Sequence, residues 1–234
     1  MIKCDILEAD REKECNKMVE VMKLPRRQTL SEELFNAISH GVGALSAVAA
    51  TVLMILKSQD AWQVTAVSIY GAAMFILYMA STLYHSLTNK KAKHVFRILD
   101  HCSIFLLIAG TYTPYTLIAL RSTVGWPLFA FIWASAIVGI VLNAVSLEKF
   151  KALSNILYLL MGWAVVMTAG PLINAVAPMG CLLLLIGGIC YTVGMVFFAL
   201  GRRMYGMHPL WHVFVLAGSA FQFFSVYVYV LPHF

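Results

Sequence analysis

Long apolar runs, separated by short polar groups, fill the chain after residue 30. A helix needs roughly 20 mostly apolar residues to cross the hydrocarbon layer of a membrane, so these runs provide for about seven crossings. The predicted spans are residues 34–56, 62–87, 97–120, 125–146, 152–174, 179–200 and 208–231. The pattern therefore predicts an all-α integral membrane protein whose fold is a seven-transmembrane helix bundle.

The start of the chain has a different character. Residues 1–29 are polar and mixed in charge, and they contain no apolar stretch of the kind found in a signal peptide. Ser31, followed by Glu32 and Glu33, predicts the first helix, with the serine as N-cap and the acids where the helix dipole favours negative charge. We expect a polar cytosolic arm over residues 1–29 and a transmembrane domain over residues 30–234.

Composition agrees with a chain that is solvated mainly by lipid. Of the 234 residues, 61% are hydrophobic and only 12% are charged, whereas a soluble domain is about 25% charged. The net charge of +6 is also compatible with nucleic-acid binding, but the basic residues lie in the arm and in short loops. Membrane topology accounts for that placement better, and we expect no nucleic-acid partner.

The distribution of Lys and Arg predicts the orientation of the bundle. The arm carries seven of them, and the second, fourth and sixth loops carry four, two and two. Only Lys57 and Arg121 fall on the other side. Because basic residues are retained in the cytoplasm, the N-terminus is predicted to be cytoplasmic and the C-terminus outside. We expect a multi-pass protein of the cell inner (plasma) membrane, with the opposite orientation to a G-protein-coupled receptor.

Four ionisable side chains within the predicted spans stand out, because such groups are costly in a membrane and mark functional sites. His85 ends the second span, Asp100 lies near the start of the third, and His208 and His212 open the seventh. The predicted topology places all four at the cytoplasmic face. Side chains distant in the sequence are thus expected at one membrane depth.

The spacing of these histidines indicates a metal site. His208 and His212 lie four residues apart and share a helix face, so the pair can chelate one cation, although such a pair alone is a weak signal. A third imidazole from His85 leaves one tetrahedral position open, which is the arrangement of catalytic zinc. Zinc lowers the pKa of a coordinated water to about 7. We predict a Zn²⁺ site with His85, His208 and His212 as ligands.

Asp100 and Ser81 are the candidate catalytic residues. Asp100 could orient the water or act as a general base, or it could merely complement the start of its helix. Ser81 lies one turn before His85 and could hydrogen-bond a neighbouring group or a developing oxyanion, or bond back within its own helix. His101 lies roughly 100° around the helix from Asp100, so we expect it to pack or to support the site from outside.

These residues form an ordered set of motifs: Glu33-x-x-Asn36-x-x-Ser39-His40, Ser81-x-x-x-His85, Asp100 and His208-x-x-x-His212. Over residues 29–231 the set resembles the progestin and adipoQ receptor family, most closely its bacterial hemolysin III branch. The resemblance implies a seven-helix bundle that encloses zinc near the cytoplasmic face. By position, it makes the three histidines the ligands, Asp100 the partner of the zinc-bound water and Ser81 a neighbour of the site.

The same resemblance implies a ceramidase-like membrane hydrolase, while the bacterial branch is linked to haemolysis and to membrane lipid homeostasis. Glu33, Asn36 and His40 could form a hydrogen-bonded belt around the site or a network that caps the helix; neither alternative makes them ligands.

Three functions follow from the sequence. The first is a zinc-dependent hydrolase that cleaves an amide or ester bond in a membrane lipid. The second is a receptor or regulator of membrane state in which zinc is structural. The third is a pore-forming cytolysin, which is disfavoured because no polar stripe is expected to run through the full depth of the membrane.

Overall fold

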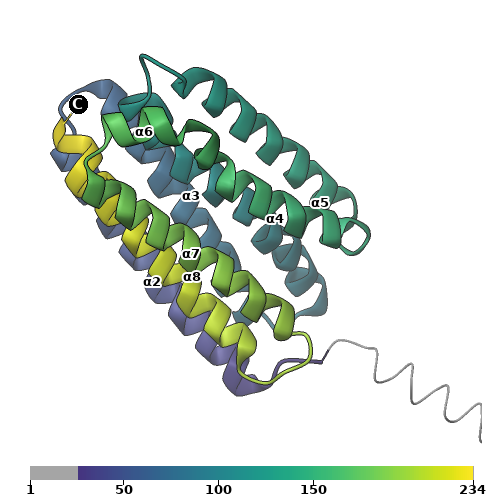
Figure 1. Ribbon diagram of the computed structural model, residues 1–234. Helices are drawn as coiled ribbons and strands as arrows, with labels where there is room; N and C mark the ends of the chain where they lie inside the picture. Colours follow the sequence, from purple (N-terminus) through teal and green to yellow (C-terminus); the bar gives the residue numbers. More distant parts are fainter. Residues whose placement is uncertain (1–25, 234) are drawn as a thin grey trace, which may run out of the picture.

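The computed structural model describes residues 26–233, and this part of the chain is helical, with no strand. Residues 1–25, most of the predicted cytosolic arm, lie outside the described residues. The long helices pack side by side in an elongated bundle (Figure 1). They are α2 (Leu30–Lys57), α3 (Ala61–Ser86), α4 (Lys90–Pro114), α5 (Gly125–Trp163), α7 (Pro178–Leu200) and α8 (Met207–Phe224); the short helix α6 (Ala169–Ala175) precedes α7.

Two of these helices are extended by π-helical turns, and short 3-10 segments complete the chain. The π-helical turns are Tyr115–Ala119 after α4 and Ser225–Val230 after α8; the 3-10 segments are Ala164–Thr168 and Leu231–His233.

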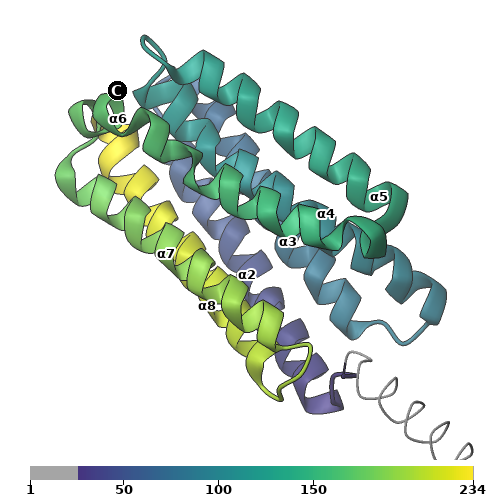
Figure 2. The ribbon, with the colours of Figure 1, turned by 45° about the vertical axis from the view of Figure 1, so that its right-hand side comes forward.

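Six helical segments are long and apolar enough to cross a membrane. This is one fewer than the predicted seven, because the predicted spans 125–146 and 152–174 fall within one helical stretch, Gly125–Ala175. That stretch is interrupted at Ser146, where φ −163° and ψ 97° are not helical. The ribbon of α5 turns back on itself, so that its two arms run in opposite directions (Figure 2). The protein is an all-helical, multi-pass membrane protein.

The N-cap of the first helix lies two residues earlier than predicted. The cap is Thr29, not Ser31: the Thr29 hydroxyl accepts the Glu32 backbone N–H at 3.4 Å, and the Glu32 carboxylate accepts the Thr29 N–H at 2.9 Å. This capping box satisfies two backbone donors that a helix start otherwise leaves unpaired. Ser31 therefore lies inside the first turn.

Helix α4 forms the centre of the bundle. In its most apolar stretch 83% of the residues are buried, compared with 17% in α7. Glycine permits the close approach of α3 and α4, since a Cβ at Gly110 would lie only 2.4 Å from the Cβ of Ala73. The outer helices instead expose apolar side chains such as Leu45, Val145 and Leu182, as a surface solvated by lipid requires.

The turn between α7 and α8 is fixed against the start of α2 (Figure 1). Gly206 has a φ of 77°, a left-handed conformation that glycine adopts without strain. Its N–H donates to the Glu32 carboxylate at 2.9 Å, and the Arg26 N–H donates to the Arg202 carbonyl at 3.0 Å. These contacts determine where α8 begins.

Candidate metal centre

Three histidines from two helices converge at this end of the bundle. His85 lies in the last turn of α3, and His208 and His212 lie one turn apart at the start of α8. One side-chain nitrogen of each lies within 4.8 Å of those of the other two. The structure thus brings together all three residues that the sequence proposes as ligands.

Each of these imidazoles has a buried nitrogen without a hydrogen-bond partner. Within residues 26–233, this is true of His85 Nε2, His208 Nε2 and His212 Nδ1. Leaving one buried polar atom unsatisfied costs about 1–3 kcal/mol. A metal ion bound by neutral imidazoles would satisfy all three nitrogens at once, so the donor set fits such an ion.

Glu33 orients the first of these histidines. The Nδ1–H of His85 donates to one Glu33 carboxylate oxygen at 2.7 Å, and Lys93 Nζ donates to the other at 2.8 Å. A carboxylate on the far nitrogen fixes the tautomer and orientation of a metal-binding imidazole, and here it leaves Nε2 available to the cluster. Of the two alternatives that the sequence leaves open for Glu33, contact with the site is the one observed.

Two other side chains of α2 also lie near the cluster. The ring of His40 stacks on His212 with a centroid separation of 3.8 Å, and its two nitrogens have no hydrogen-bond partner in the part of the chain that the structure describes. Asn36 is fully buried and donates to the Gln28 side chain at 2.8 Å. His40 therefore packs against a candidate ligand. The Asn36 amide instead donates to Gln28, which lies just before α2.

A polar cavity of about 730 Å³ adjoins the cluster, and His208 is part of its wall. Asp100 from α4 and Ser81 from α3 line the same cavity. Ser81 is buried. The predicted carboxylate and hydroxyl thus lie where they could act on a molecule that reaches the histidines.

His101 has a structural environment. Its ring meets the edge of Phe198, with centroids 5.8 Å apart, and its backbone carbonyl accepts the Tyr158 hydroxyl at 2.7 Å. The ring is also part of the cavity wall. His101 thus packs against Phe198 and lies close to the site, as we expected from its place on the helix.

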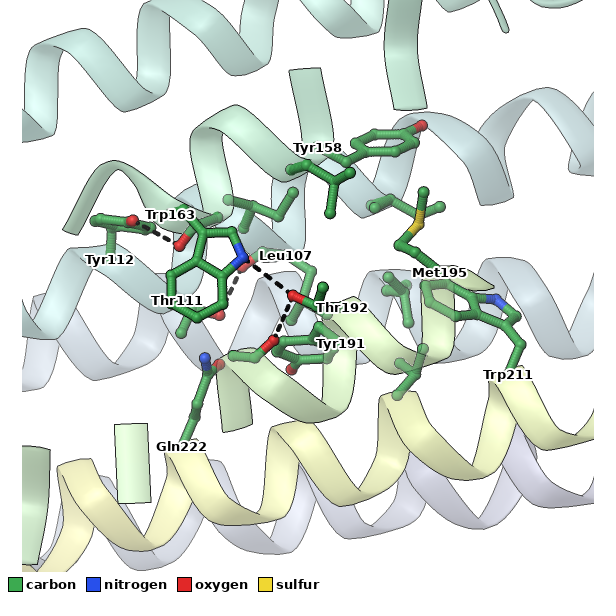
Figure 3. Close-up of a pocket in the computed structure, with 17 residues that line it drawn as sticks. Leu107, Thr111, Tyr112, Tyr158, Trp163, Tyr191, Thr192, Met195, Trp211 and Gln222 are labelled. Carbon is green, nitrogen blue, oxygen red and sulfur yellow. Dashed lines mark hydrogen bonds between the residues drawn. The ribbon is translucent and has the colours of Figure 1, made fainter. Parts of the chain in front are cut away.

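Two apolar pockets lie beyond the polar cavity. An apolar pocket between α4, α5, α7 and α8 adjoins the cavity (Figure 3). The residues common to both walls are Leu77, Ile104, Trp211 and Val215. Among the few polar contacts around this pocket, Trp163 Nε1 donates to the Thr192 hydroxyl at 3.0 Å (Figure 3). A further apolar cavity of about 340 Å³ shares Thr111, Tyr112 and Trp163 with this pocket.

Comparison with known proteins identifies the family. The sequence model described as "Haemolysin-III related" matches residues 28–223, which include the three histidines. The chain belongs to the haemolysin-III-related family. It is 45% identical to Hemolysin-3 of Bacillus cereus over 208 residues, which are 88% of this chain and 94% of that protein.

Two further relatives extend the comparison. The Hemolysin-3 homolog of Bacillus subtilis (strain 168) is 41% identical over 204 residues, covering 86% of this chain and 95% of that protein. The human monocyte to macrophage differentiation factor is 28% identical over 215 residues, which are 87% of each chain. These matches confirm the predicted resemblance to the hemolysin III branch of the progestin and adipoQ receptor family.

Proposed function

We propose that the protein is a zinc-dependent hydrolase that cleaves an amide or ester bond in a membrane lipid. The observation that carries the proposal is the meeting of three unpartnered imidazole nitrogens next to a cavity that contains Asp100. The adjoining apolar pocket supports a lipid substrate, because acyl chains can leave the polar cavity there without entering water. In this proposal the lipids of the membrane are the substrate, and the activity serves their homeostasis.

The proposal includes a specific topology. The two antiparallel arms of α5 would be separate spans, which makes seven crossings, with the N-terminus in the cytoplasm and the C-terminus outside the inner (plasma) membrane. The strong excess of Lys and Arg at the histidine end supports this orientation.

The chain's own residues would divide the chemistry among them. His85, His208 and His212 would hold the zinc ion, with Glu33 fixing the His85 ring. When bound, zinc supplies a Lewis acid that polarises a carbonyl group and makes water more acidic. Asp100 would take a proton from the attacking water and return it to the leaving group. Ser81, which lines the same cavity, would orient the Asp100 carboxylate.

A pore-forming cytolysin is the second candidate, and the names of the two bacillary relatives favour it. The lining of the two inner cavities argues against it, since both are bounded mainly by apolar side chains. A water-filled pathway needs polar walls.

The test is hydrolysis by purified full-length protein. Zinc-loaded wild-type protein should release fatty acid from at least one lipid in a panel of ceramides and glycerophospholipids, measured by mass spectrometry. His85→Ala should lose both zinc and fatty-acid release. His94→Ala is the control, because His94 is an exposed histidine outside the cavity wall and should keep both.

A protein that contains stoichiometric zinc but is inert towards the whole panel would contradict the hydrolase. If His85→Ala then lowered zinc content and thermal stability together, the result would favour the regulator with structural zinc.

A further inference from the structure

The wall of the polar cavity is strongly cationic. Seven Lys and Arg side chains line it, against the three carboxylates of Glu33, Asp100 and Glu148. Three of the cations are neutralised by ion pairs: Lys93 with Glu33, Arg97 with Glu148, and Arg26 with Glu32 behind the wall. The other four have no ion-pair partner among residues 26–233; they are Arg27, Lys90, Lys151 and Arg202.

Two of these four cations reach the same cavity from different elements. Lys151 comes from the second arm of α5 and Arg202 from the turn after α7. Glu148 lines the same cavity, and it already pairs with Arg97. Two positive charges in one cavity disfavour each other, so an anion bound between them would be stabilising. This pair therefore indicates an anionic ligand.

The same pair lies on the wall that leads to the histidines. Lys151 is half-buried, and its ammonium group lies 5.7 Å from the ring centroid of Phe198. The ring of Phe198 in turn lies 5.9 Å from that of His208. An anion bound by Lys151 would thus be separated from the candidate metal centre by one aromatic side chain.

Membrane topology alone does not explain this arrangement. The retention of basic residues in the cytoplasm accounts for cations at this end of the bundle, but not for their position within it. Lys149 and Arg203 are the sequence neighbours of the pair, and both lie outside the cavity wall. They provide matched controls for a site built from Lys151 and Arg202.

We propose that the polar cavity binds the phosphate of a net-anionic lipid headgroup, so that the substrate is an anionic phospholipid; the catalytic part of this inference rests on the proposed hydrolase function. Basic pockets between membrane helices on the cytoplasmic side recognise anionic headgroups. Lys and Arg bind phosphate through charge-assisted hydrogen bonds. The apolar pocket beyond the histidines and the further apolar cavity that shares its wall would together accept an acyl chain of the same molecule.

This arrangement specifies which bond of the lipid would be cleaved. With the headgroup at Lys151 and Arg202 and a chain in the apolar pocket, the ester carbonyl would lie in the cavity between them, near Asp100. Water would add its hydroxyl to the acyl carbon, the bond from that carbon to the ester oxygen would break, and the water proton would pass to the leaving oxygen through Asp100. The products are a fatty acid and a lysophospholipid.

Binding can be measured without turnover. Full-length protein in an uncharged maltoside detergent, which provides no charged surface, is titrated with fluorescent phosphatidylglycerol or phosphatidylcholine. Wild-type protein should bind phosphatidylglycerol about tenfold more tightly than phosphatidylcholine. Lys151→Gln/Arg202→Gln should lose that preference, while Lys149→Gln/Arg203→Gln should keep it. Lys151→Arg preserves the charge and should also keep it, which separates the role of the charge from a folding defect.

Equal binding of the two lipids by wild-type protein would overturn the inference, as would an equal loss in both double variants. Inorganic phosphate is added as a third ligand: if it binds as tightly as phosphatidylglycerol, the site recognises free phosphate and not a lipid.

Zinc content and fatty-acid release are measured on the same preparations. Headgroup preference without zinc or release would contradict the proposed hydrolase and leave the headgroup site standing. Fatty-acid release without headgroup preference would contradict the headgroup site and leave the proposed hydrolase standing.

Discussion

The two ends of the helix bundle both contain polar side chains, but they use them differently. At the end opposite the histidines, Asp60 caps α3 by accepting the Gln63 backbone N–H at 2.7 Å, and Trp62 Nε1 donates to the Leu117 carbonyl at 2.6 Å. Arg121 lies over the Trp62 ring, 4.4 Å from its centroid. These groups satisfy helix ends and tie neighbouring elements together.

The histidine end contains polar atoms that the described chain does not satisfy. Away from the histidine end, three buried side-chain atoms of the described residues lack a partner, and they belong to separate residues: Gln63 Nε2, Tyr70 Oη and Gln222 Oε1. At the histidine end three such nitrogens come within 4.8 Å of one another. An isolated unpartnered atom is a local cost in stability, whereas three that meet indicate a shared ligand. This difference distinguishes polar groups that stabilise the fold from those that form the candidate site.

The largest effect is expected from Asp100→Asn, which tests whether the histidine end is catalytic. Asparagine keeps the shape of the side chain but cannot take a proton from water. Loss of a general base typically lowers turnover by about 10²–10⁴-fold. Fatty-acid release should therefore fall by that factor, with zinc content unchanged. Activity within a few fold of wild type would remove Asp100 from the mechanism.

Glu33→Gln should have the next largest effect, because it weakens the support of His85. Loss of a carboxylate behind a metal-binding imidazole typically lowers metal affinity by about 10–100-fold. Competition with a chromophoric chelator measures this change.

The neighbouring acid is the control. Glu32→Gln loses contacts to Arg26 and Gly206 that hold the α7–α8 turn, and it should cost about 1–3 kcal/mol of stability while metal affinity stays near that of wild type. Equal losses of affinity in the two variants would show that Glu33 acts through the fold and not through His85.

The smallest effect is expected at the opposite end. Asp60→Ala removes the N-cap of α3 and should lower the free energy of unfolding by about 1 kcal/mol. Zinc content and headgroup preference should not change. A loss of zinc in this variant, seen by elemental analysis beside a thermal unfolding curve, would mean that the two ends are coupled.

The sequence predicts the helices well where the thickness of the membrane sets their length. The predicted span 62–87 differs from α3, Ala61–Ser86, by one residue at each end. The first helix begins earlier than predicted because the pair Thr29 and Glu32 caps it, a pattern that can be seen in the sequence but competes there with Ser31. The π-helical turn Tyr115–Ala119 has no signal in the apolar pattern, because packing against neighbouring helices determines it.

The candidate site, too, could be predicted only in part from the sequence. His85 and His208 could be placed at one membrane face because each lies at the end of a predicted span. The contact between Glu33 and His85 could not be predicted, since it depends on how α2 and α3 are rotated about their own axes. The stacking of His40 on His212 is unpredictable for the same reason.

Metal analysis of the purified protein tests the central claim most directly. Wild-type protein should contain about one zinc ion per chain, and the His208→Ala/His212→Ala variant should contain almost none, since two of the three proposed ligands are gone. Equal zinc in both proteins, or no zinc in wild-type protein purified without chelator, would contradict the assignment of the histidine cluster as a metal centre.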